Sequence, residues 1–172
     1  GEITAEKLLK LLSEGHTVVL TQAKVVGKLD FGTLEGVEPS PGFRLVTVPG
    51  MLVATEVQFG DSVIAGSQTL CVRFAQPVSF TASTFHNYAT FREAVFSEGA
   101  RFERTEFLSH ANFQGTQFRG PAIFAQAILG DQALFQRSHF HHFANFTKAE
   151  FRGDMTFQMA HFHADAHFLA VN

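Results

Sequence analysis

The sequence predicts an all-β repeat solenoid, and three observations support this prediction. The first is composition, because 21 of the 172 residues are Phe, against one Tyr and no Trp. The second is spacing, because Phe recurs from residue 80 onward at alternating intervals of five and six residues. The third is a small residue, Ala, Ser or Thr, two positions before almost every Phe. One structural position that is filled repeatedly is typical of a repeat architecture.

A short amphipathic α-helix is expected at residues 4–14, with Thr4 as its N-cap and Gly15 as its stop. Its leucines lie along one side at helical spacing. The open end of a solenoid exposes apolar surface and unpaired backbone, so we expect this side to cap the first coil. The leucines are Leu8, Leu9, Leu11 and Leu12.

Residues 17–77 are predicted to form irregular β coils. Between Val18 and Phe31, apolar residues alternate with others in the period of a strand. The segment 36–42 contains two prolines and two glycines, which predicts a loop. The apolar runs after it are expected to be further short strands.

Residues 78–172 contain the strict repeats, with Phe at sixteen of seventeen positions and Leu at the other. The small residue and the Phe are two positions apart, so both point to the same side of a strand. A small residue beside a large one lets the rings fill the interior, and stacked units accumulate one core. The predicted core positions are Phe80, Phe85, Phe91, Phe96, Phe102, Phe107, Phe113, Phe118, Phe124, Leu129, Phe135, Phe140, Phe146, Phe151, Phe157, Phe162 and Phe168.

These units resemble the pentapeptide-repeat family in its Phe-centred variant, in which every second unit has one extra residue. Examples are AT-F-REAV-F-SEG from Ala89 and AN-F-TKAE-F-RGD from Ala144. The resemblance implies a right-handed quadrilateral β-helix with four units, or 22 residues, per coil. It therefore predicts a single solenoid domain over residues 1–172.

Outward residues also recur at intervals of 22, which agrees with this coil length. Gln114, Gln136 and Gln158 each follow a Phe at intervals of 22 residues, and we expect their side chains to form a hydrogen-bonded ladder. His139 with His161, and His141 with His163, form two further pairs at this interval.

The four histidines are the candidate binding site. His139 and His141 flank Phe140, and His161 and His163 flank Phe162, so all four imidazoles share one predicted face. Neutral imidazoles this close suit Zn²⁺, Ni²⁺ or Cu²⁺, and below about pH 6.5 they would become cationic. The alternative is a solvated surface without a ligand. No other cofactor is expected.

Charge and composition disfavour other classes. The net charge of -3 gives no basic footprint for nucleic acid. Some pentapeptide-repeat proteins mimic duplex DNA and bind type II topoisomerases, but from Val78 onward eight acidic residues face seven basic ones, far from an acidic surface. Ser109, His110 and Glu106 resemble a hydrolytic triad, yet flat faces offer no oxyanion site. Cys71 is expected to be a buried thiol.

We therefore expect a non-enzymatic scaffold or protein-interaction module. No apolar stretch reaches the roughly 20 residues of a membrane helix, so we expect no membrane insertion and a cytoplasmic location. The chain begins with Gly1, and a preceding segment would alter that location. At the other end, two copies could meet through Phe168, Leu169 and Val171, or the chain could be part of a longer protein.

Overall fold

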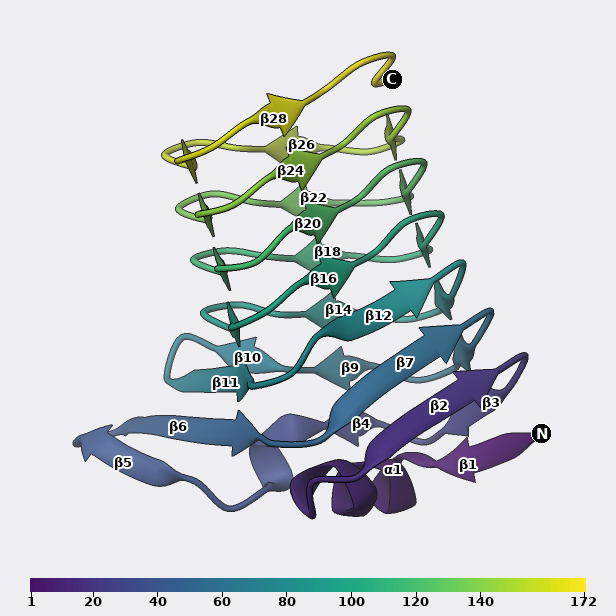
Figure 1. The fold of residues 1–172 in the computed structure, drawn as a ribbon, viewed down its shortest axis with the longest axis vertical. Coiled ribbons are helices and arrows are strands. Elements are labelled where there is room, and N and C mark those ends of the chain that lie inside the picture. Colours follow the sequence, from purple (N-terminus) through teal and green to yellow (C-terminus); the bar gives the residue numbers. More distant parts are fainter.

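The computed structural model describes every residue from Gly1 to Asn172. The chain winds into a β-solenoid whose sides are four sheets of stacked parallel strands (Figure 1). We name the four sheets A to D, and each coil passes through them in the order B, A, C and D. Strands pair with their equivalents one coil away, as His139 does with His161. The predicted four-sided β-solenoid with 22 residues per coil is confirmed.

Sheets A and B have seven strands each. Sheet A consists of β1 (Glu2–Thr4), β3 (Lys24–Val26), β8 (Gln58–Phe59), β13 (Thr84–Phe85), β17 (Glu106–Phe107), β21 (Ile128–Leu129) and β25 (Glu150–Phe151). Sheet B consists of β2 (Thr17–Thr21), β7 (Met51–Thr55), β12 (Val78–Thr81), β16 (Ala100–Arg101), β20 (Ala122–Ile123), β24 (Ala144–Asn145) and β28 (Ala166–His167).

Sheets C and D have six and eight strands. Sheet C consists of β4 (Leu29–Asp30), β9 (Val63–Ile64), β14 (Ala89–Thr90), β18 (Ala111–Asn112), β22 (Ala133–Leu134) and β26 (Met155–Thr156). Sheet D consists of β5 (Val37–Ser40), β6 (Phe43–Val48), β10 (Gly66–Ser67), β11 (Leu70–Phe74), β15 (Val95–Phe96), β19 (Gln117–Phe118), β23 (His139–Phe140) and β27 (His161–Phe162). A short 3-10 helix, η1 (Phe31–Thr33), follows β4.

The helix α1 (Ala5–Ser13) closes one end of the solenoid (Figure 1). The hydroxyl of Thr4 accepts a hydrogen bond from the amide of Lys7 at 3.1 Å, which is the N-cap that the sequence predicts. Gly15 adopts a left-handed φ of +87° just beyond the helix, where a side chain would be strained. Three of the four leucines, Leu8, Leu9 and Leu12, are buried against the first coil. The fourth, Leu11, is only half-buried.

The loop predicted at residues 36–42 is wrong over Val37–Ser40, which forms the strand β5. This strand runs antiparallel to β6 and projects from the solenoid as a hairpin (Figure 1). Its register shifts between Val37 and Ser40, and β5 occupies an edge of sheet D. An edge strand tolerates Pro39, because a missing amide there costs no hydrogen bond within the sheet. The prolines of this segment are therefore compatible with an edge strand as well as with a turn.

The core consists of stacked phenylalanine rings. Phe91, Phe113, Phe135 and Phe157 form one column, with ring centroids 5.2, 4.9 and 4.8 Å apart and planes within 10° of parallel. Rings of neighbouring columns meet edge to face, an arrangement that their quadrupoles favour. The predicted core positions from Phe80 to Phe146 are buried. The last four have a coil on one side only and are more exposed: Phe151, Phe157, Phe162 and Phe168.

Neighbouring coils are joined mainly through the backbone. The amide of Gly115 donates to the carbonyl of Gln136, and the amide of Arg137 donates to the carbonyl of Gln158, each at 3.0 Å. No side-chain hydrogen bond joins Gln114, Gln136 and Gln158, and Oε1 of Gln136 is buried without a partner. The glutamines therefore occupy equivalent positions on successive coils, but the predicted hydrogen-bonded ladder is absent.

Candidate metal centre on sheet D

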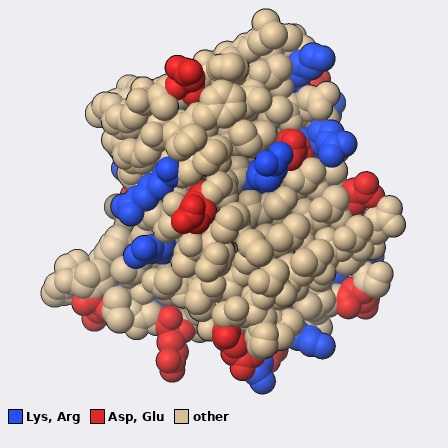
Figure 2. Space-filling model, viewed as in Figure 1, with Lys and Arg blue, Asp and Glu red and all other residues tan.

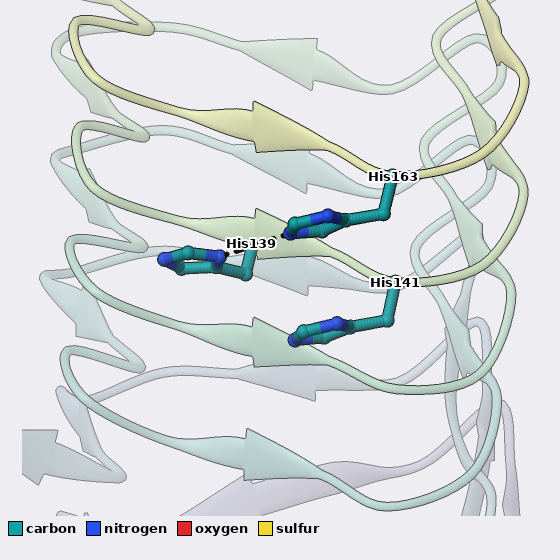
Figure 3. A group of neighbouring side chains, drawn as sticks. All are labelled: His139, His141 and His163. Atoms are coloured by element: carbon teal, nitrogen blue, oxygen red, sulfur yellow. Dashed lines mark hydrogen bonds between the residues drawn. The ribbon is translucent and has the colours of Figure 1, made fainter.

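The four candidate histidines lie on the outer surface at β23 and β27, within the strands or one residue after them. The alternation of side chains along a strand explains why they point outward. Phe140 and Phe162 point into the core and stack with ring centroids 4.7 Å apart. Side chains on either side of an inward residue point outward. The imidazoles of His139, His141, His161 and His163 therefore share one face of sheet D, as the sequence predicts. Figure 3 shows three of them, His139, His141 and His163.

The imidazoles form two stacked pairs, one on each side of the Phe column. The ring centroids of His139 and His161 are 4.7 Å apart, and those of His141 and His163 are 4.8 Å apart. Both pairs have nearly parallel planes, at 6° and 4°. The spacing is that of neighbouring β-strands, so the backbone imposes it on the rings.

The closest contact between ring nitrogens crosses from one pair to the other. Nδ1 of His139 lies 3.2 Å from Nε2 of His163, which comes from the next coil (Figure 3). The ligand nitrogens of His139, His141 and His163 all lie within 4.8 Å of one another. His161 is not part of this group, although its ring stacks on that of His139. The structure thus brings together the ring nitrogens of three of the four predicted residues.

A neighbouring amide orients the third histidine. Oε1 of Gln117 lies 2.7 Å from Nε2 of His141, so that nitrogen donates the hydrogen bond and carries the proton in the neutral ring. Gln117 pairs with His139 across β19 and β23. Gln117 was not among the predicted site residues: its position 22 residues before His139 places it on the neighbouring coil but does not indicate its contact with His141.

The surroundings favour the neutral form of two of these rings. Partial burial, followed by the charges of His161, His141 and His163, lowers the pKa of His139. Partial burial, followed by the charges of His163 and Arg119, lowers the pKa of His141. A neutral imidazole has a free lone pair, which is the form that ligates a metal ion.

The contact between His139 and His163 matches the ligand spacing of a tetrahedral ion. With bonds of about 2.0 to 2.1 Å, two imidazole nitrogens on tetrahedral Zn²⁺ are about 3.3 Å apart. The 3.2 Å between Nδ1 of His139 and Nε2 of His163 is close to this value. His141 would need to leave Gln117 and turn inward to join them. His139 and His163, the preset pair, are therefore joined by a ring-to-ring hydrogen bond at the spacing of two metal ligands, and His141 is the third imidazole nearby. One nitrogen of the pair carries the proton of this bond, which a metal ion would displace.

Other candidate residues do not assemble into a site. Both nitrogens of His110 face other partners than Ser109: Nδ1 lies 3.1 Å from Oε1 of Gln132, and Nε2 lies 3.5 Å from Oδ2 of Asp131. Burial, followed by the charge of Glu93, raises the pKa of the Cys71 thiol, which disfavours the reactive thiolate.

The predicted dimer contact is untested by the isolated chain. Phe168 and Leu169 are 42% and 74% exposed, and Val171 is half-buried. Pairing of two copies through these residues stays a prediction. No helix in the structure combines the length and apolarity required to cross a membrane.

The four-sided stack of coils defines a β-solenoid repeat protein. The family model described as pentapeptide repeats (9 copies) matches residues 80–128 and 102–149. Together with the Phe-centred coils, this match identifies residues 80–149 as pentapeptide repeats. No curated protein and no solved structure matches the chain.

Proposed function

We propose that this protein is a non-enzymatic scaffold that binds one divalent transition-metal ion on its histidine face, the surface formed by His139, His141, His161 and His163. The observation behind this proposal is the 3.2 Å contact between Nδ1 of His139 and Nε2 of His163, with His141 in reach. Three imidazole donors without thiolate or carboxylate favour Zn²⁺, Ni²⁺ or Cu²⁺ over Mg²⁺ or Ca²⁺, which prefer oxygen ligands.

The solenoid supports such a role because it fixes its outward side chains. The two ligands of the preset pair lie on neighbouring coils, which are joined through the backbone in all four sheets. Ligands held by a rigid frame lose little conformational entropy on binding, which favours affinity. The same frame supports the scaffold role, since each flat face presents columns of side chains to a partner.

Calorimetric titration of the untagged chain with Zn²⁺ at about pH 7.5 tests the metal site. We expect saturable binding of one ion per chain. The variant His139→Ala/His163→Ala removes the preset pair and is expected to abolish it. His86→Ala is the matched control, since His86 is also exposed and faces Gln58, but it lies outside the cluster.

Two results would contradict the metal site. One is undiminished Zn²⁺ binding by His139→Ala/His163→Ala, and the other is equal loss in His86→Ala. Light scattering with and without Zn²⁺ then addresses the scaffold role. A metal-independent oligomer favours self-association of the scaffold, whereas association only with Zn²⁺ links assembly to the histidine face.

Mimicry of duplex DNA is the alternative that the family suggests. It requires a continuous acidic surface. On the side drawn in Figure 2, Lys and Arg lie among Asp and Glu, and no continuous acidic area is seen. A supercoiling assay with a type II topoisomerase separates the two functions, and inhibition by this chain would favour the mimic.

A further inference from the structure

The outward side chains around the candidate metal centre are neutral or basic. On the strands β11, β15, β19, β23 and β27, and at the position after each, no outward residue is Asp or Glu. The residues before each inward Phe are Arg73, Val95, Gln117, His139 and His161, and those after it are Ala75, Ser97, Arg119, His141 and His163. The protein thus supplies no anionic ligand on this face.

A metal ion at this site would keep its full charge. Neutral imidazoles donate lone pairs but no negative charge, and a bound dication is then the largest local charge. Three nitrogen donors also leave at least one position of a tetrahedral ion open. His141 and His163 are exposed, so the open position faces solvent. Charge and coordination both favour an anion from solution.

Arg119 is the basic residue next to His141 in the column of outward side chains. The amide of His141 donates to the carbonyl of Phe118 at 2.9 Å, which makes Arg119 and His141 neighbours in one column. Arg119 is exposed and forms no ion pair. A guanidinium presents paired donors that match the oxygens of an oxyanion.

The nearest carboxylates do not replace such an anion. Asp165 lines a shallow hollow of about 330 Å³ with His141 and His142, but its oxygens are not among the ligand atoms within 4.8 Å. Glu93, at the corner between sheets C and D, is paired with Arg137. Glu98 lies at the opposite corner of sheet D, on the coil below Arg119.

We propose that the metal-loaded histidine face binds a small oxyanion between the open coordination position and the guanidinium of Arg119. This inference rests on the proposed metal site and adds its ligand. The anion is recognised by charge and by two sets of oxygen contacts. Inorganic phosphate has this chemistry and serves as the probe.

Cobalt makes the test possible, because the visible absorption of bound Co²⁺ changes with its ligands. The Co²⁺-loaded chain is titrated with inorganic phosphate in a non-coordinating buffer at constant ionic strength. We expect a saturable spectral change. In Arg119→Gln, phosphate affinity should fall by about tenfold or more, because a charge-assisted contact is lost. Affinity for Co²⁺ should not fall, since the variant removes a neighbouring positive charge.

Arg152→Gln is the control, because Arg152 is an exposed arginine on the sheet A side, where it pairs with Glu150. It should leave both affinities unchanged. A Co²⁺ spectrum that does not respond to phosphate, or an equal response in Arg119→Gln, overturns the anion site and leaves the metal site standing. Failure of Co²⁺ to bind overturns both proposals.

Discussion

Glu93 and Arg137 form an ion pair that spans two coils, with Oε1 of Glu93 3.3 Å from Nη2 of Arg137. The residues are 44 positions apart, and Gly115 occupies the same column between them. A Cβ built on Gly115 would lie 2.6 Å from both carboxylate oxygens of Glu93. The pair therefore passes over the one residue of the column that has no side chain.

Gly115→Ala is expected to lower the free energy of unfolding by about 1 to 2 kcal/mol. Gly115 has φ of +64°, a left-handed conformation that costs a side chain about this much, and the new methyl would displace Glu93. Glu93→Ala alone should cost less than about 1 kcal/mol, because the ion pair is near the surface. Urea denaturation measures both. Gly60→Ala is the control, since a Cβ there meets nothing within 4 Å.

Phe113→Ala should lower the free energy of unfolding by about 3 to 5 kcal/mol, because it leaves a cavity within the ring columns. Phe113 is fully buried and stacks on Phe91 and Phe135. Gln114→Ala, one position along and facing outward, should cost far less. Chemical denaturation compares the two variants, and equal losses would contradict the assignment of inward and outward positions.

Thr105→Val should cost about 1 to 2 kcal/mol, although the two side chains have nearly the same shape. The hydroxyl of buried Thr105 donates to the carbonyl of Phe80 on the neighbouring coil at 2.8 Å, and valine cannot replace that donor. Thr105→Ser keeps the hydroxyl and should retain most of the stability. A thermal melt in which valine equals wild type would show that this hydrogen bond contributes nothing.

The histidine face should make the fold less stable in acid. The pKa values of His139 and His141 are lowered in the folded chain, so below about pH 6.5 the unfolded chain binds more protons. The free energy of unfolding therefore falls as pH drops from about 6.5 through the lowered pKa values. Denaturation with EDTA at about pH 7.5 and 5.5 measures this change.

The variant His139→Gln/His141→Gln should show a smaller loss of stability between these two pH values. His86→Gln, outside the cluster, serves as the control. An equal loss in the double variant and the wild type would assign the acid sensitivity to other groups.

The positions of the core and of the four histidines were predictable, because both depend on backbone periodicity alone. A residue two places from a Phe points the same way, and a residue 22 places away lies on the next coil. The hairpin of β5 and β6 was not predictable from this rule, since it departs from the repeat. Its prolines indicated only a break.

The chemistry of the histidine face was less predictable. The spacing places His139, His161 and His163 near one another, but side-chain torsions decide which nitrogens meet. These torsions bring Nδ1 of His139 to His163 and leave His161 stacked outside the group. They also direct His141 to Gln117, an interaction that the repeat pattern does not encode.

The backbone hydrogen bonds that join the coils have a consequence for how such a protein can change over time. They run through amides and carbonyls, which every residue type except proline supplies in full. Single outward positions can therefore be exchanged one at a time while the frame persists. An inserted or deleted residue within a strand is different, because it moves the inward residues of that strand to the outside. Extra residues are accommodated only where they leave the coil, as the β5–β6 hairpin does. The outward residues on the faces of the solenoid can therefore vary, whereas the 22-residue length of the regular coils is constrained.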